Sequence, residues 1–109
     1  MKLLTKELLK AFAEQGNTSN KNASEIKVIA KFFNPAGAGT WFATEYDEDY
    51  KEFFGYANLG DDDCAELGCF SSVELASYKG PLGLGIERDL HFPIGKYTLK
   101  EIVDRKGHL

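Results

Sequence analysis

The chain has 109 residues, enough for one domain that buries a hydrophobic core without help from metal ions or disulfides. Its composition, 43% hydrophobic and 28% charged with eight Phe, five Tyr and one Trp, is typical of a globular protein and excludes a disordered chain. The formal net charge of −4 and the pI near 5.1 mark an acidic protein and disfavour direct binding to nucleic acid.

The N-terminal stretch MKLLTKELLKAF carries charged residues at short intervals. It therefore lacks the uninterrupted apolar stretch of a signal peptide, and no later segment has the apolar length of a membrane span. We expect a cytoplasmic protein with no membrane partner. The sequence does not specify an oligomeric state.

Hydrophobic periodicity divides the chain into helices and strands. Helices are predicted where apolar residues recur at helical spacing, and strands where β-branched and aromatic residues alternate. The predicted elements are a helix at 2–15, strands at 26–33, 40–46, 52–59, 66–69 and 86–92, a central helix between Ser71 and Gly80, and a last helix that begins at Thr98. We predict a single α+β domain over residues 1–109, with an antiparallel sheet of about four or five strands packed by three short helices.

Polar residues at the predicted helix starts support these boundaries. Thr5 is a natural N-cap for the first helix. Ser71 with Glu74, and Thr98 with Glu101, have the spacing of a capping box, in which each side chain bonds a backbone N–H of the other. The polar residues 17–25 are predicted to form a surface loop.

The two cysteines and two histidines are the first candidates for metal chemistry. Cys64 and Cys69 are predicted to be reduced thiols that pack in the fold, because a domain of this size needs no disulfide. A zinc site from Cys64, Cys69, His91 and His108 would have suitable ligand types but matches no familiar ligand spacing. No nucleophile has a visible base partner, so no catalytic residue, metal or cofactor is predicted.

Arg88 interrupts an apolar strand face. In a regular strand it would lie with Ile86 and Leu90 on the side toward the core, where a guanidinium needs a partner. Glu45 is placed similarly, since it would share a strand face with Trp41 and Ala43. We therefore predict that Arg88 pairs with Glu45 or, failing that, with Glu74.

The opposite face of the same strand would carry Glu87, Asp89 and His91. Alternating charge on a solvated strand explains this pattern, and an acid/base or metal cluster is the alternative. With Arg88 and Glu45, these residues would form the site of a small hydrolase or nuclease-like enzyme.

Acidic residues are concentrated in the segment 41–66, where Lys51 is the only base. The acids are Glu45, Asp47, Glu48, Asp49, Glu52, Asp61, Asp62, Asp63 and Glu66. We expect one end of the sheet to project a concentrated negative potential. These acids would be explained if they lie on solvated hairpin tips, where their charge keeps the protein soluble and prevents edge-to-edge pairing of sheets. A docking surface for a basic partner, or a mimic of nucleic-acid phosphates, is the functional interpretation. The run Asp61-Asp62-Asp63 does not reproduce the alternating spacing of a calcium loop.

Several short motifs occur together in a familiar order. They are MKLLTKELLKAF, Lys31-Phe-Phe33, Trp41-Phe-Ala-Thr-Glu-Tyr-Asp47, Phe53-Phe-Gly-Tyr56, Glu66-Leu-Gly-Cys-Phe-Ser71, Gly80-Pro-Leu-Gly83 and Ile86-Glu-Arg-Asp89. Together they resemble a bacterial family catalogued as a domain of unknown function (number 2958), whose members are often carried on plasmids and other mobile elements. Cys69 stands where an aromatic residue is expected, and Gly85 where proline is common.

The resemblance implies an accessory role in plasmid maintenance, transfer or evasion of host defence, and it brings no catalytic residue. Our leading hypothesis is a non-catalytic interaction module whose acidic hairpin edge binds a basic partner such as a DNA-binding protein. The enzyme alternative requires its polar side chains to converge in one pocket. A small-ligand pocket lined by Trp41, Tyr46 and Tyr56 is a third possibility.

Overall fold

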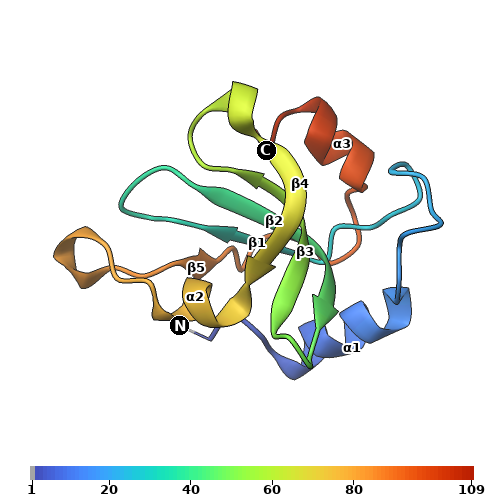
Figure 1. Cartoon of the computed structure of the whole chain (residues 1–109), viewed down its shortest axis with the longest axis horizontal. Helices are drawn as coiled ribbons and strands as arrows, with labels where there is room; N and C mark the ends of the chain where they lie inside the picture. The colour runs from blue at the N-terminus through green and yellow to red at the C-terminus, as the bar shows by residue number, and fades with distance from the viewer. Residues whose placement is uncertain (1) are drawn as a thin grey trace.

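A five-stranded antiparallel sheet forms the centre of the molecule, with strand order β4-β3-β2-β1-β5 (Figure 1). The computed structural model describes residues 2–109. The strands are β1 Ala30–Phe33, β2 Thr40–Asp47, β3 Glu52–Asn58, β4 Glu66–Ser71 and β5 Glu87–Arg88. The α-helices are α1 Lys6–Gln15, α2 Ser72–Ser77 and α3 Leu99–Asp104, and short 3₁₀ turns lie at η1 Asp62–Cys64 and η2 Pro81–Gly83. The predicted α+β class, with five strands and three helices, is confirmed.

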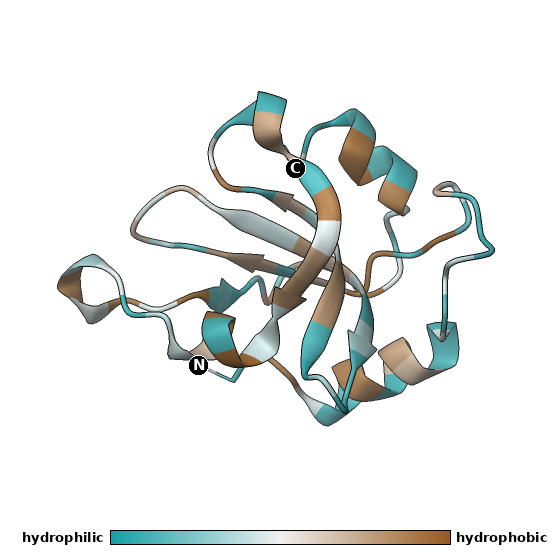
Figure 2. Ribbon diagram, in the orientation of Figure 1, coloured by the Kyte–Doolittle hydropathy of each residue, from teal (hydrophilic) through white to brown (hydrophobic). Residues whose placement is uncertain are grey.

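The two faces of the sheet carry separate hydrophobic clusters. On one face α1 and α2 cover a cluster that includes Leu8, Phe12, Phe32, Phe53 and Leu75. On the other face α3 covers a smaller cluster that includes Ile26, Val28, Phe42, Leu99 and Ile102. We call these the α1 face and the α3 face. Figure 2 shows hydrophobic residues along the strands, whereas the segment after α1 is mostly hydrophilic.

The helix starts follow the capping residues that the sequence predicts, so the first helix begins at Lys6 and the predicted start at residue 2 is wrong. The Thr5 hydroxyl accepts a hydrogen bond from the Leu8 amide at 3.2 Å, so α1 begins at the next residue. Thr98 and Glu101 form both bonds of a capping box before α3. Before α2 the Ser71 hydroxyl accepts from the Glu74 amide, but among the described residues the reciprocal bond of the predicted capping box is not formed. No helix of residues 2–109 is long and apolar enough to cross a membrane.

A β-bulge in β2 changes which face its last residues occupy. The pairing with β3 is regular up to Ala43 and resumes at Glu45, so Thr44 is an extra residue. Its hydroxyl donates to the Phe54 carbonyl at 3.2 Å. Trp41 and Ala43 therefore lie on the α1 face, while Glu45 lies opposite Phe54 on the α3 face. The predicted common face for Trp41, Ala43 and Glu45 is wrong.

The first strand is shorter than predicted, because residues 26–29 leave the regular ladder. Lys27 bridges to Thr98, and the Val28 amide donates to the Tyr97 carbonyl at 2.9 Å. Val28 consequently packs with the α3-face cluster, whereas Ala30 packs on the α1 face.

The last strand is also shorter than predicted. A regular strand over 86–92 is replaced by the two residues of β5. The Asp89 carboxylate accepts from the His91 amide at 2.9 Å, a local turn that ends the strand. Leu90, predicted to face the core, is 62% exposed as a result.

Candidate functional site

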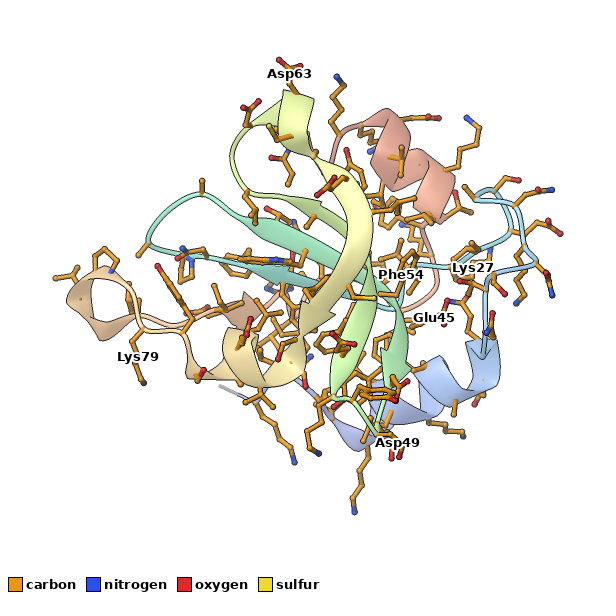
Figure 3. The ribbon with its side chains drawn as sticks, in the orientation of Figure 1. Lys27, Glu45, Asp49, Phe54, Asp63 and Lys79 are labelled. Carbon is orange, nitrogen blue, oxygen red and sulfur yellow. The ribbon has the colours of Figure 1, made fainter. Side chains whose placement is uncertain are left out.

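The predicted acidic residues divide into two clusters at opposite ends of β3. Asp47, Glu48, Asp49 and Glu52 surround the β2–β3 turn, and we call them the tip acids. Asp61, Asp62 and Asp63 lie at the β3–β4 turn. Figure 3 shows Asp49 and Asp63 far apart on the molecule. Because β3 separates its two turns, the predicted single concentration of negative charge at one end of the sheet is wrong.

The acids of the β3–β4 turn make local structural bonds. Asp61 accepts from the Asp63 amide at 3.0 Å and caps η1. Asp62 Oδ1 accepts from Asn58 Nδ2 at 2.8 Å and lies 2.7 Å from His108 Nε2. The hydrogen bonds from Asn58 and His108 hold the pKa of the Asp62 carboxyl below its ordinary value. These contacts tie the turn to the C-terminal segment.

Three of the tip acids, Asp47, Glu48 and Glu52, border a groove of about 880 Å³. The groove lies partly on the α3 face, between the C-terminal end of α1, the loop 17–25 and strands β3 and β4. Phe54, Leu67 and Cys69 form an apolar floor, because the β3–β4 register places their side chains on the same face. Leu67 is 48% exposed. α3 thus leaves this part of the sheet uncovered.

The charge around the groove is strongly negative. The charged residues that line it are Glu45, Asp47, Glu48, Glu52 and Lys21, four acids and one base. Pairing across β2 and β3 places Asp47 opposite Glu52 and Glu45 opposite Phe54. The acids therefore lie beside the apolar floor.

Glu45 also fixes one wall of the groove. Its Oε2 accepts hydrogen bonds from both the amide and the hydroxyl of Thr18, the amide bond measuring 3.2 Å. Thr18 is buried although it lies in a polar loop. Figure 3 shows Glu45 and Phe54 in the region between α1 and α3. The carboxylate anchors the loop 17–25 and still borders the groove.

Gln15, the last residue of α1, holds the other end of this loop. Its side-chain amide donates to the Lys27 carbonyl at 2.8 Å and to the Thr44 carbonyl at 2.7 Å. Its oxygen accepts from the Lys27 amide at 2.8 Å. One side chain thus joins α1, the segment before β1 and the bulge of β2, and it sets the position of the groove wall.

The predicted ion pair of Arg88 is wrong. Arg88 lies opposite Phe32, a residue of the α1-face cluster, whereas the bulge places Glu45 on the α3 face. Within residues 2–109 there is no ion pair that joins Arg88 to Glu45 or to Glu74. The prediction failed because it assumed regular alternation through the bulged strand.

The polar cluster predicted on the last strand does not converge on the groove. Asp89 pairs with Lys31 at 3.3 Å, with side chains that are 26% and 16% exposed. Glu45 lines the groove, but Glu87, Arg88, Asp89 and His91 do not. β5 is separated from β2 by β1, which explains the distance between these groups. The pocket that the enzyme alternative requires is therefore not assembled in the described chain.

The residues of the disfavoured zinc alternative are also not grouped. In the described range no group of three or more His, Cys, Asp or Glu side chains could hold a metal ion. Cys64 and Cys69 are free thiols, as predicted, but both are exposed and so are not packed in the core. His108 contacts Asp62 instead of a cysteine.

The small-ligand pocket that was the third possibility is not formed by its three aromatic residues. Trp41 and Tyr46 pack on the α1 face, whereas Tyr56 is buried in the cluster of the α3 face. Burial, and to a smaller extent the charge of Asp62, raises the pKa of Tyr56. Only Tyr46 of these three residues lines the groove.

Sequence reasoning missed Gln15, Thr18, Phe54 and Leu67. Gln15 and Thr18 had no sequence signal, because their partners are backbone groups and a carboxylate distant in the chain. Phe54 and Leu67 lie in predicted strands, and their partial exposure depends on how much of the face α3 covers.

Comparison with known proteins identifies the family. The family model described as "Protein of unknown function (DUF2958)" matches residues 3–105, and the chain belongs to this family. Comparison with curated proteins and with solved structures gives no significant match.

Proposed function

We propose that this protein is a non-catalytic interaction module that binds a basic segment of a partner protein in the groove. The observation that carries the proposal is that an apolar floor lies directly beside an acidic rim, formed by Glu45, Asp47, Glu48 and Glu52. Phe54 and Leu67 offer apolar contact area, and the four acids beside them attract Lys or Arg side chains. The proposed binding surface therefore includes the acidic hairpin of β2 and β3, as the sequence hypothesis expected, but not the distant β3–β4 turn.

Two of the rim carboxylates are available for a partner. Glu48 and Glu52 are exposed, and within residues 2–109 neither side chain makes a hydrogen bond or ion pair. Glu45, by contrast, is committed to Thr18. A basic segment would therefore meet Glu48 and Glu52 without displacing internal contacts. Because these acids are exposed, added salt should weaken the complex.

The partner class that fits this charge is a basic protein such as a DNA-binding protein. Such proteins carry Lys- and Arg-rich segments that complement an acidic surface. The family resemblance implies a mobile-element setting, and this setting supports an accessory role in plasmid maintenance, transfer or evasion of host defence. We include this role in the proposal.

The test is a selection of short peptides from a displayed random library, followed by fluorescence anisotropy of the peptide enriched most. The test variant is Glu48→Gln with Glu52→Gln. The control variant, Glu7→Gln with Asp63→Asn, removes the same two charges from exposed positions outside the groove. We expect the enriched peptides to combine apolar residues with Lys or Arg. Their affinity should fall about tenfold in the test variant and little in the control.

Two results would overturn the proposal. One is a selection that enriches no peptide, or only peptides without basic residues. The other is equal binding by the test and control variants, which would leave the tip acids as solubilising groups.

A further inference from the structure

The outer edge of β4 is open. β4 is an end strand of the sheet and, within residues 2–109, pairs only with β3. The Ser72 amide donates to the Lys51 carbonyl at 2.9 Å, and antiparallel ladders alternate between inward and outward backbone groups. The same alternation along β4 directs the backbone N–H and C=O groups of residues 66, 68 and 70 toward β3. The N–H and C=O groups of Leu67 and Cys69 therefore point outward. Outside the β3–β4 ladder, no hydrogen bond between described residues involves these two backbones.

The edge also lacks the usual protection against strand pairing. Exposed edges are commonly protected by Lys, Pro, a bulge or a covering segment. β4 contains neither Lys nor Pro, and its register with β3 is continuous. A Cβ added to Gly68 would meet no atom within 4 Å, so no described atom lies close to the face of the strand at its middle.

The open edge and the groove are continuous. The side chains of Leu67 and Cys69 lie on the groove floor, and their backbones supply the outward-pointing groups. An added strand would therefore place every second side chain beside this floor. The same segment would contact the groove through its side chains and β4 through its main chain.

We propose that the partner segment binds as an extended strand added to the outer edge of β4, with its alternate side chains in the groove. This inference rests on the proposed function and specifies its geometry. Main-chain hydrogen bonds to Leu67 and Cys69 supply affinity, and the acidic rim selects basic side chains.

The charge near β4 favours a basic segment over a second copy of this chain as the occupant of the open edge. Two copies paired through β4 would bring the acids that line both grooves, including Glu52 on the neighbouring strand, to one shared sheet. Like charges brought together oppose association. A segment that carries Lys or Arg gains from the same groups.

The test uses the peptide enriched most in the selection and two N-methylated versions of it. Each version carries methyl groups on one of the two alternating sets of amides, so only one version loses the N–H groups that face β4. We expect that version to bind about tenfold more weakly or worse, and the other to bind like the parent. Amide hydrogen exchange at Leu67 and Cys69 should slow when the parent peptide binds, while exchange at Gly68 should not change.

The alternatives give different results. If both methylated versions bind equally, and Leu67 and Cys69 are not protected, the segment lies across the groove without pairing; strand addition is then wrong and the proposed function stands. If no peptide binds, both proposals fail. If sedimentation shows a dimer without peptide, and exchange at Leu67 and Cys69 is already slow, a second copy occupies the edge and the proposed occupant is wrong.

Discussion

Replacing Gln15 with Ala should destabilise the protein far more than an ordinary change at a helix end. The side chain makes three hydrogen bonds of 2.7–2.8 Å that join α1 to Lys27 and to the bulge at Thr44. Each bond contributes about 1 kcal/mol net, and water can replace part of the contacts at the exposed Lys27. We therefore expect a loss of about 2–3 kcal/mol in the free energy of unfolding.

The assay is urea and thermal unfolding followed by circular dichroism. A loss of this size corresponds to a fall of about 8–12 °C in Tm for a domain of this length. Gln15→Glu keeps the shape of the side chain but turns a carboxylate oxygen toward two carbonyl oxygens, so at neutral pH it should be at least as destabilising as Gln15→Ala.

Glu14→Ala is the matched control. Glu14 is the preceding residue of α1, and its exposed contact with Lys10 measures 4.0 Å, so the change should cost less than about 0.5 kcal/mol. If Gln15→Ala and Glu14→Ala have the same effect, the Gln15 bonds do not hold the groove wall. Faster hydrogen exchange at the Lys27 amide is expected only in the Gln15 variant.

Two further predictions concern the sheet and its far turn. Gly55→Ala should lower the free energy of unfolding by about 3 kcal/mol, because a Cβ there would overlap a backbone carbonyl of β2. Gly68→Ala should change the free energy of unfolding by less than about 0.5 kcal/mol. Equal unfolding curves for the two variants would contradict this difference. Hydrogen bonds from Asn58 and His108 lower the pKa of Asp62 in the folded state. The carboxylate therefore stabilises the folded state at pH values above its ordinary pKa of 3.8, and this stabilisation is lost as the pH falls through the lowered pKa. His108→Ala should raise the pKa of Asp62 toward 3.8 in an NMR titration of the carboxyl carbon, and an unchanged pKa would refute the contact.

Local signals in the sequence were sufficient for most of the fold. The capping residues Thr5, Ser71 and Thr98 mark the observed helix starts, and alternation located the strands although not the full extent of the first and last, because both signals depend on neighbours in the chain. The bulge at Thr44 had no such signal, since threonine fits a regular strand equally well. That single inserted residue moved Glu45 to the other face and removed the predicted pairing with Arg88.

The candidate site was only partly predictable. The tip acids were identified from charge alone, but their separation from Asp61–Asp63 follows from the hairpin topology, in which successive turns lie at opposite ends of a shared strand. The groove depends on the short length of α3 and on the hydrogen bonds that hold Thr18 to Glu45. Both are tertiary features that no local pattern encodes.

The most direct test of groove binding is an NMR titration of the isotope-labelled protein with the peptide enriched most in the selection. Chemical-shift changes should be concentrated at Glu48, Glu52, Phe54, Leu67 and Cys69, and they should diminish as salt is added. Shifts concentrated at Asp61–Asp63 instead, or on the α1 face, would contradict the assignment of the groove as the binding site.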